Sequence, residues 1–231
     1  MQVAAWRTAT VLDVRPETAT AVTLRLGLDV PLRHRAGQHV VVRLTAPDGY
    51  TAQRSYSIAS PPDDGTVFDL TVERLPTGEV SPFLHDVVEE GDELEVRGPI
   101  GGWFVWDGDF PALLVGGGSG VVPLMAMLRH ARRTGAEHLV RLVVSVRAPD
   151  DLYYADELPG PETMVVYTRV APAGATRPVR RLTAEDFGTI DEHSTVYICG
   201  SARFADGASN VLLDAGVPPE RIRVERFGPT G

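Results

Sequence analysis

The segment from Val115 to Pro123 reads Val-Gly-Gly-Gly-Ser-Gly-Val-Val-Pro, with apolar residues on both sides. The apolar run before it predicts a strand, and the run after it predicts a helix. In that context glycines let a pyrophosphate approach the main-chain N–H groups at a helix N-terminus. The segment departs from the Rossmann pattern G-x-G-x-x-G, because Val121 stands where the third glycine belongs. We therefore expect a phosphate-binding turn made by Gly116, Gly117, Gly118 and Gly120.

A second group with chemical potential lies in a predicted strand, Arg54-Ser55-Tyr56-Ser57. Strand alternation places Arg54 and Tyr56 on one face and the two serines on the other. A cation, an aromatic ring and a hydroxyl can together neutralise a phosphate, cover a flat isoalloxazine ring and hydrogen-bond its edge. The competing interpretation is a barrel strand whose polar residues simply face outward.

A third group, Gly78-Glu79-Val80-Ser81, precedes a predicted helix that starts near Ser81 and stops at Gly91. N–H groups at a helix start bind anions, and glycine lets a phosphate come close. The same spacing also occurs where a serine merely caps a helix, so that interpretation stays open. The apolar face of this helix is expected to consist of Phe83, Leu84, Val87 and Val88.

The elements that must position these groups fall into two classes. Six β-rich runs, over 7–14, 21–26, 38–45, 53–59, 66–73 and 93–97, predict a closed six-stranded antiparallel barrel with the helix as a lid. After 106–111 strands alternate with helices, which is typical of an α/β domain with a parallel sheet. Its expected strands are 112–115, 139–146, 164–168, 195–199 and 222–225, and its expected helices are 121–133, 151–158, 184–187 and 202–214. We predict a barrel domain over 1–108 and an α/β domain over 109–231.

Composition narrows the class of protein. The 231 residues carry a net charge of -9 and the sequence pI is about 5.1, which argues against a nucleic-acid surface because phosphate binding needs a basic face. No apolar run is long enough to span a bilayer, and the first seven residues lack the features of a signal peptide, so we expect a cytoplasmic protein away from membranes. The one cysteine, Cys199, excludes a disulfide, a four-cysteine zinc site and a thiolate-held iron–sulfur cluster within this chain.

In this order the motifs resemble the flavin and NAD(P) domains of the ferredoxin-NADP reductase superfamily, over nearly the whole chain. The resemblance rests on Arg54-x-Tyr56-Ser57, Gly78-x-x-Ser81, Gly98 to Phe104, Gly116 to Pro123, Tyr197 to Gly200 and Glu225 to Gly231. It implies an FAD-dependent NAD(P)H oxidoreductase that passes electrons to a separate ferredoxin, flavodoxin or monooxygenase. Two alternatives stay open: a reductase of free flavin or FMN, and a non-catalytic flavin-binding sensor or regulatory subunit.

The resemblance also implies roles for residues on the flavin side. Arg54 pairs with the FAD pyrophosphate, Tyr56 packs against the isoalloxazine, and Ser57 hydrogen-bonds near N5, the atom that accepts hydride. Further contacts to the FAD phosphates come from Gly78, Val80 and Ser81. Phe227 stacks on the flavin face where nicotinamide arrives; four residues follow it here, whereas some relatives end on this aromatic.

On the nicotinamide side, the resemblance implies that the four glycines line the dinucleotide, with Cys199 and Gly200 beside the nicotinamide ring. The expected catalytic residues are Ser57, Cys199 and Glu225. Gly200 is followed by Ser201 instead of the family's proline, and Phe204 replaces a common methionine. We expect both changes to be tolerated, because both positions belong to the turn and first helical turn after the strand.

Arginines near the predicted nicotinamide site favour NADPH over NADH. The end of the second strand, Ser145-Val146-Arg147, contains no acid, whereas an NAD-binding protein usually has one there. The residues that match 2'-phosphate ligands of NADP-linked relatives are Arg147, Thr168, Arg169 and Arg181, and arginine binds phosphate through two parallel hydrogen bonds. NADH stays open, since NADH-linked relatives also carry arginines here and the cluster of Arg177, Arg180 and Arg181 is compatible with a solvated loop.

Overall fold

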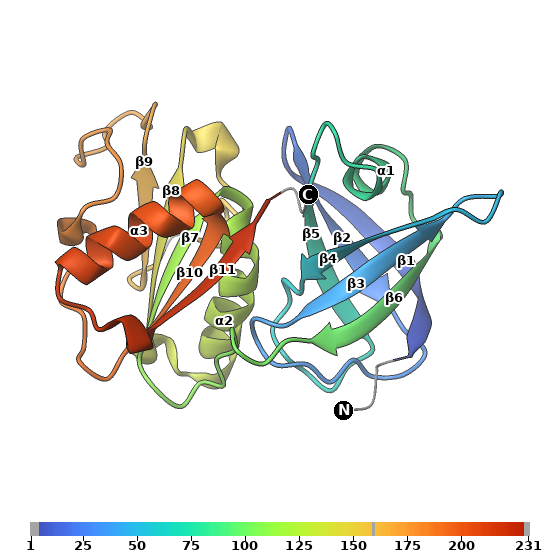
Figure 1. The fold of residues 1–231 in the computed structure, drawn as a ribbon, viewed down its shortest axis with the longest axis horizontal. Helices are drawn as coiled ribbons and strands as arrows, with labels where there is room; N and C mark the ends of the chain where they lie inside the picture. The colour runs from blue at the N-terminus through green and yellow to red at the C-terminus, as the bar shows by residue number, and fades with distance from the viewer. Residues whose placement is uncertain (1–4, 159, 229–231) are drawn as a thin grey trace.

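The computed structural model describes residues 5–158 and 160–228 (Figure 1). In its N-terminal half, strands in which buried and exposed residues alternate form a β-barrel. Its strands are β1 (Trp6–Thr18), β2 (Ala21–Gly27), β3 (His39–Thr45), β4 (Thr51–Ser57), β5 (Val67–Glu73) and β6 (Glu93–Ile100). They pair antiparallel in the order β4-β3-β6-β1-β2-β5, and a bridge between Ile58 and Leu70 joins the end of β4 to β5. The predicted six-stranded antiparallel barrel is thus confirmed.

Helix α1 (Val80–Asp86) lies at one end of the barrel. Val80, Leu84 and Val88 are buried in the barrel core, but Phe83 is 39% exposed and Val87 is 55% exposed. The prediction that these last two share the buried face is therefore wrong. Within the helix, Leu84 faces the core, and Phe83, the residue before it, is rotated about 100° toward solvent. The helix also ends earlier than the predicted stop at Gly91.

The C-terminal half contains the predicted parallel sheet, with an α-helix on each of its two faces. Its strands are β7 (Ala112–Gly117), β8 (Val140–Val146), β9 (Thr163–Tyr167), β10 (Thr195–Ser201) and β11 (Ile222–Phe227), in the order β11-β10-β7-β8-β9. Its helices are α2 (Val121–Thr134) and α3 (Ala202–Asp214). Short 3₁₀ turns are η1 (Gly118–Gly120), η2 (Glu137–Leu139), η3 (Pro149–Asp151), η4 (Ala184–Phe187) and η5 (Pro219–Arg221). Coverage on both faces explains why the central strands are apolar throughout.

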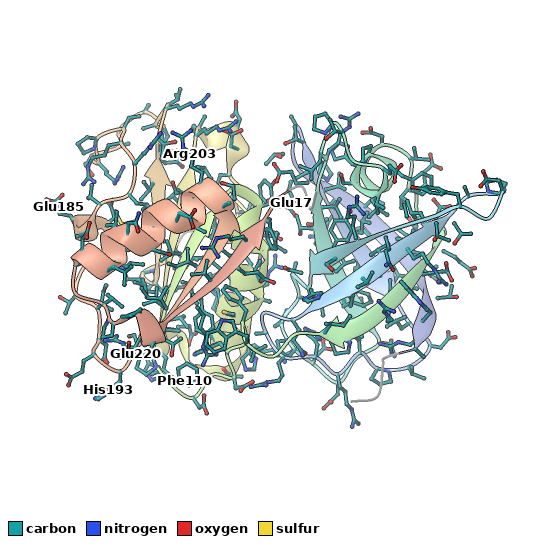
Figure 2. The ribbon with its side chains drawn as sticks, viewed as in Figure 1. Glu17, Phe110, Glu185, His193, Arg203 and Glu220 are labelled. Carbon is teal, nitrogen blue, oxygen red and sulfur yellow. The ribbon has the colours of Figure 1, made fainter. Side chains whose placement is uncertain are left out.

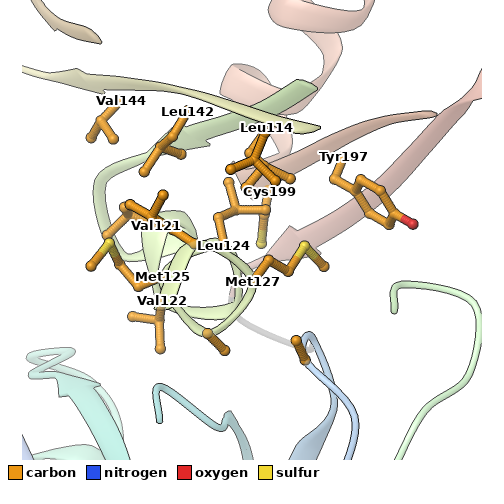
Figure 3. Close-up of a cluster of buried hydrophobic side chains, with 14 of the residues drawn as sticks. Leu114, Val121, Val122, Leu124, Met125, Met127, Leu142, Val144, Tyr197 and Cys199 are labelled. Atoms are coloured by element: carbon orange, nitrogen blue, oxygen red, sulfur yellow. The ribbon is translucent and has the colours of Figure 1, made fainter. Parts of the chain in front are cut away.

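Helix α2 lies between the parallel sheet and the barrel, while α3 covers the opposite face of the sheet (Figure 1). Alternate residues of the strands, such as Leu114, Leu142, Val144 and Cys199, pack on α2 (Figure 3). The same cluster includes the barrel residues Ala36 and Ala59 and the connecting residues Phe104 and Trp106. The helix ends at Thr134, and Gly135, with a left-handed φ of 73°, caps it.

The segment 151–158 does not form the predicted helix. After η3 it continues as hydrogen-bonded turns, and Tyr154 adopts a φ of 55°, which a right-handed helix cannot contain. The N–H group of Tyr154 donates to Glu17 of β1 and its hydroxyl donates to Thr71 of β5. These long-range contacts outweigh the helical tendency of the local sequence.

The stretch 101–111 connects the two sheets and contains the expected domain boundary at 108/109, which stays a prediction. Trp106 of this stretch pairs with Ala36 of the barrel while its side chain packs in the α2 cluster. Within the described residues, none of the helices has the length and apolar character needed to traverse a membrane.

Candidate functional site

The carboxyl edge of the parallel sheet brings together several of the predicted site residues. Cys199 on strand β10 lies between Gly116 of β7 and Glu225 of β11. Further along, Ser201 lies beside Phe227, which is partly buried against the α2 cluster. Ligands of open α/β sheets bind at this edge. Of the four residues that follow Phe227, the last three (229–231) lie outside the described residues.

Packing within the protein accounts for most of the glycine-rich turn. A Cβ atom on Gly120 would lie 2.1 Å from the carbonyl oxygen of Cys199, and one on Gly117 would lie 2.5 Å from the ring of Phe204. Gly118 differs, because its φ is 56° and a Cβ atom added to it would have no other atom within 4 Å. No side chain caps the start of η1 or of α2. The turn therefore has open space beside uncapped main chain, which fits a phosphate group.

Strand β4 presents the predicted flavin residues on two faces. Arg54 and Tyr56 pair with Val42 and Val40, two core residues, so they share one face as predicted. Burial raises the pKa of the Tyr56 phenol, which stays neutral. Arg54 is exposed, with its guanidinium donating to the carbonyl of Gln53 at 2.7 Å. Ser57 is buried on the other face.

The residues Gly78 to Ser81, at the start of α1, have a structural role beside the predicted role in phosphate binding. The Ser81 hydroxyl accepts the N–H of Leu75 at 3.1 Å, and the N–H of Gly78 donates to the carbonyl of the same leucine at 2.9 Å. Val80 is fully buried in the barrel core, so only its main chain can contact a ligand. Ser81 thus closes this turn and retains its hydroxyl proton for another acceptor.

A cavity of about 190 Å³ lies at the junction of the two halves and is lined by residues from both. Its polar side chains are His39 of β3 and Glu225 of β11. The other lining residues are Gly37, Gly101, Gly102, Trp103, Phe104 and Val224. The Oε2 atom of Glu225 is buried without a hydrogen-bond partner in the described structure. Such an orphaned acceptor is satisfied by a ligand or by water, so the junction fits a bound group with a polar edge.

Burial favours the neutral form of each titratable group at this junction. It raises the pKa of Glu225 to about 7 and lowers the pKa of His39. Burial, and after it the charge of Glu225, raises the pKa of the Cys199 thiol well above its ordinary value. Cys199 is therefore a neutral thiol at pH 7, while Glu225 can take either form.

His39, Trp103 and Phe104 were not predicted as site residues. A usable signal existed for His39: pairing across the β3–β4 hairpin places it opposite Ser57, and that partner follows from the position of the turn between the strands. For the two aromatic residues, no local pattern indicates that a later strand will contribute to the same cavity.

Three of the predicted 2'-phosphate residues, Arg147, Thr168 and Arg169, directly follow β8 and β9. The fourth, Arg181, is next to Arg180, whose N–H donates to the carbonyl of Tyr167 at the end of β9. The N–H of Arg169 donates to the carbonyl of Arg147 at 2.9 Å, and the Thr168 hydroxyl donates to the carbonyl of Val146 at 3.1 Å. Among residues 5–158 and 160–228, no carboxylate forms an ion pair with Arg147, Arg169 or Arg181, unlike the neighbouring arginines. Three cations at this edge thus remain available to an anion.

The neighbouring arginines have internal partners. Arg177 and Arg180 both form ion pairs with Asp186, which is buried, at 2.6 Å and 3.2 Å. Both therefore brace the loop onto η4, and neither is merely solvated.

Comparisons with known proteins agree with this architecture. Residues 12–105 match the model of the oxidoreductase FAD-binding domain, and residues 114–210 match that of the oxidoreductase NAD-binding domain. The reductase component of propane 2-monooxygenase from Rhodococcus jostii is 28% identical over 94% of this chain. The glycine betaine monooxygenase reductase subunit of Pseudomonas aeruginosa is 32% identical over 85% of it. The chain spans 62% and 57% of the lengths of these two relatives.

A solved structure supports the fold. The FAD/NAD-binding domain of nitric oxide dioxygenase from Vibrio cholerae superposes with a TM-score of 0.84. The match covers 96% of this chain and 99% of the other, at 24% sequence identity. The two-domain fold predicted from the sequence is thereby confirmed, whereas the individual roles of the site residues stay predictions.

The raised pKa of Glu225 predicts a specific dependence of stability on pH. Between its ordinary value of 4.5 and about 7, the unfolded state has lost the carboxyl proton while the folded state retains it. Stability therefore falls as pH rises through this window and is constant above it. In Glu225→Gln this contribution is absent, so the Tm difference, variant minus wild type, should grow from pH 4.5 to about pH 7. Thermal unfolding of the apoprotein measures it.

The matched control is Glu220→Gln, an exposed carboxylate just before the same strand, which should show a constant difference across this range (Figure 2). A constant difference for Glu225→Gln as well would contradict the inference of a buried, protonated carboxyl group.

Proposed function

Because the chain belongs to the ferredoxin-NADP reductase superfamily, we propose that it is an NAD(P)H-dependent flavoprotein reductase that delivers electrons to a separate acceptor. The observation that carries the proposal is the junction itself. The end of β4 and the carboxyl edge of β7, β10 and β11 belong to two nucleotide-binding domains, and Glu225 has an unsatisfied oxygen in the cavity between them.

Bound FAD supplies the redox chemistry, accepting hydride from NAD(P)H and releasing electrons singly, and the protein supplies position and electrostatics. Arg54 provides the cation for the FAD pyrophosphate, and the neutral, half-buried Tyr56 provides an apolar face for the flavin ring. Ser57 provides a hydroxyl on the opposite face of β4, near N5. Phe227 covers the face where nicotinamide enters.

On the nicotinamide side, the open space at Gly118 and the uncapped main chain bind the pyrophosphate. Cys199 places a neutral thiol beside the nicotinamide ring, and Gly200 lets the ring come close. Glu225 holds its proton when its surroundings are apolar and releases it when a positive charge is nearby, because its pKa is about 7. An oxidised nicotinamide ring is such a charge.

The acceptor is proposed to be an oxygenase component or its ferredoxin. Reductase components of monooxygenase systems are among the relatives. The two alternatives, a free-flavin or FMN-type reductase and a non-catalytic flavin-binding regulator, make different predictions about retained cofactor and hydride transfer.

The deciding experiment mixes FAD-loaded, desalted protein anaerobically with NADPH or NADH and follows the flavin absorbance. We expect a yellow protein that bleaches with nicotinamide and then reduces ferricyanide. Release of the reduced flavin would favour the free-flavin alternative, and so would FMN extracted from the protein as purified, before FAD is added. A flavin that stays oxidised would favour the regulator, and a colourless protein that does not bind added FAD would contradict the proposal.

Arg54→Ala should weaken FAD binding by about 10- to 100-fold, because hydrogen bonds to charged groups contribute about 1.5–3 kcal/mol. Flavin fluorescence quenching gives the dissociation constant. Arg25→Ala, which removes an exposed strand arginine from β2, is the control and should bind FAD normally. Equal affinities of the two variants would remove Arg54 from the flavin site.

NADPH is the preferred donor in our proposal, because the unpaired arginines at the ends of β8 and β9 suit a 2'-phosphate. Replacing both Arg147 and Arg169 by alanine should raise KM for NADPH about tenfold or more and change KM for NADH by less than about twofold. Steady-state ferricyanide reduction with each donor measures both constants. A parallel rise in the two KM values would mean that these arginines do not read the 2'-phosphate.

A further inference from the structure

Arg129, on the barrel-facing side of α2, connects the two halves of the molecule. Its Nη1 donates to the carbonyl oxygen of Ala59 at 2.8 Å, and its Nε and Nη2 donate to the carboxylate of Glu157 at 2.8 and 2.5 Å. Ala59 is fully buried and comes two residues after Ser57, at the end of the predicted flavin strand. The arginine lies on the helix that begins at the glycine-rich turn. One side chain therefore spans from the nicotinamide helix to the flavin strand.

Tyr154 is the second connection, and it is buried. Its hydroxyl donates to Thr71 Oγ1 at 2.5 Å, and its main-chain N–H donates to Glu17 Oε2 at 3.1 Å. The guanidinium of Arg129 lies 4.6 Å from the centre of the Tyr154 ring, a cation–π contact. Strands β1 and β5 of the barrel are thus joined to the segment 152–158 of the α/β half, and Figure 2 labels Glu17 at this junction.

The hydroxyl groups form a chain with one direction. Thr23 donates to Glu17 Oε1 at 2.7 Å, and because a carboxylate only accepts, this uses the threonine's single proton. The 2.7 Å contact between Thr23 and Thr71 must then be donated by Thr71, which in turn accepts from Tyr154. Tyr154, Thr71, Thr23 and Glu17 therefore form a chain in which each hydroxyl donates to the next group, and hydrogen bonds in such a chain strengthen one another.

The geometry of Tyr154 indicates that this contact takes precedence over the local backbone. Its left-handed φ of 55° is unfavourable for a tyrosine and is retained only where the surroundings require it. The structure adopts this conformation and gives up the helix predicted for 151–158. The contacts of Tyr154 with the barrel therefore determine its backbone conformation.

A nearby contact provides a comparison. Arg133, one turn further along α2, also reaches across to the barrel, but its ion pair with Asp63 is 3.8 Å long and the two side chains are 43% and 45% exposed. Exposed ion pairs of this kind contribute little. The Arg129 side chain is only 13% exposed. Its removal would leave the Ala59 carbonyl and the Glu157 carboxylate without a partner at the interface.

We propose that Arg129 and Tyr154 form a clamp that sets the distance between the nicotinamide-binding turn and the flavin strand, and thereby act as positioning residues for hydride transfer. This inference rests on the proposed function for its catalytic consequence, but not for its structural one. Hydride transfer requires reacting atoms about 3–3.5 Å apart, and a displacement of about 1 Å can cost about 100-fold in rate. The clamp touches neither predicted cofactor site, so its loss changes geometry and leaves binding intact.

The test compares Arg129→Met, which keeps the apolar stem of the side chain, with Arg133→Met on the same helix. At saturating NADPH the rate of flavin reduction should fall about 10- to 100-fold in Arg129→Met, with KM and FAD retention within about twofold of wild type. In calorimetry of the apoprotein, the single unfolding transition expected for wild type should separate into two. Arg133→Met should match wild type in every measurement.

Tyr154→Phe decides the matter if Arg129→Met does not fold, because it removes only the hydroxyl at the start of the donor chain. Its rate of flavin reduction should also fall, but by less than in Arg129→Met, and KM should not change. The unfolding transition of the apoprotein should broaden. A folded variant of either residue with wild-type rate and a single sharp transition would overturn the clamp. If neither NADPH nor NADH reduces the flavin of the wild-type protein, the proposed function fails. The clamp is then still tested by the number of unfolding transitions of the apoprotein in calorimetry.

Discussion

The arrangement of both cofactor domains depends on the burial of helix α2 between two sheets. Residues 121–128 are all buried, since one side of the helix packs on the parallel sheet and the other on the barrel. A Cβ atom added to Gly116 would lie next to Leu124, and one added to Gly37 would lie next to Met127. Leu124 therefore faces the parallel sheet, and Met127 faces the barrel. Each such residue contributes about 1.5–3 kcal/mol when fully buried. Because residues 121–128 are buried on all sides, the N-terminal turn of the helix and the adjoining Arg129 have little freedom.

Apolar and polar contacts have different effects at this junction. Hydrophobic burial holds the two halves together, but it is non-directional and would tolerate small rotations. Hydrogen bonds from Arg129 and Tyr154 have defined lengths and angles, so they select one orientation among those that bury the same area. A cavity and an unsatisfied carboxylate oxygen remain where the halves do not close, between His39 and Glu225. The incomplete part of the interface is the part where chemistry is proposed.

The glycine-rich turn shows how one motif serves packing and ligand binding together. Gly117 and Gly120 permit Phe204 and the Cys199 carbonyl to approach the turn, which brings β10 and its thiol next to the main chain of the turn. Gly118 supplies the open side. Packing therefore explains most of the glycines, and the ligand explanation depends on the remaining one together with the uncapped helix start. The Phe204 ring also suits this turn, since glycines leave it the room.

Local patterns were sufficient for the barrel strands, the parallel sheet, the position of α2, and the shared face of Arg54 and Tyr56. Each depends on neighbours a few residues apart, so periodicity and turn residues carry the information. They were insufficient for the segment around Tyr154, for the exposed Phe83 and for the raised pKa of Glu225. Those outcomes depend on groups far away in the chain, such as Glu17 and Thr71 for Tyr154. Only the tertiary packing brings such groups together, because burial and hydrogen-bond competition are decided by whichever residues share the same space.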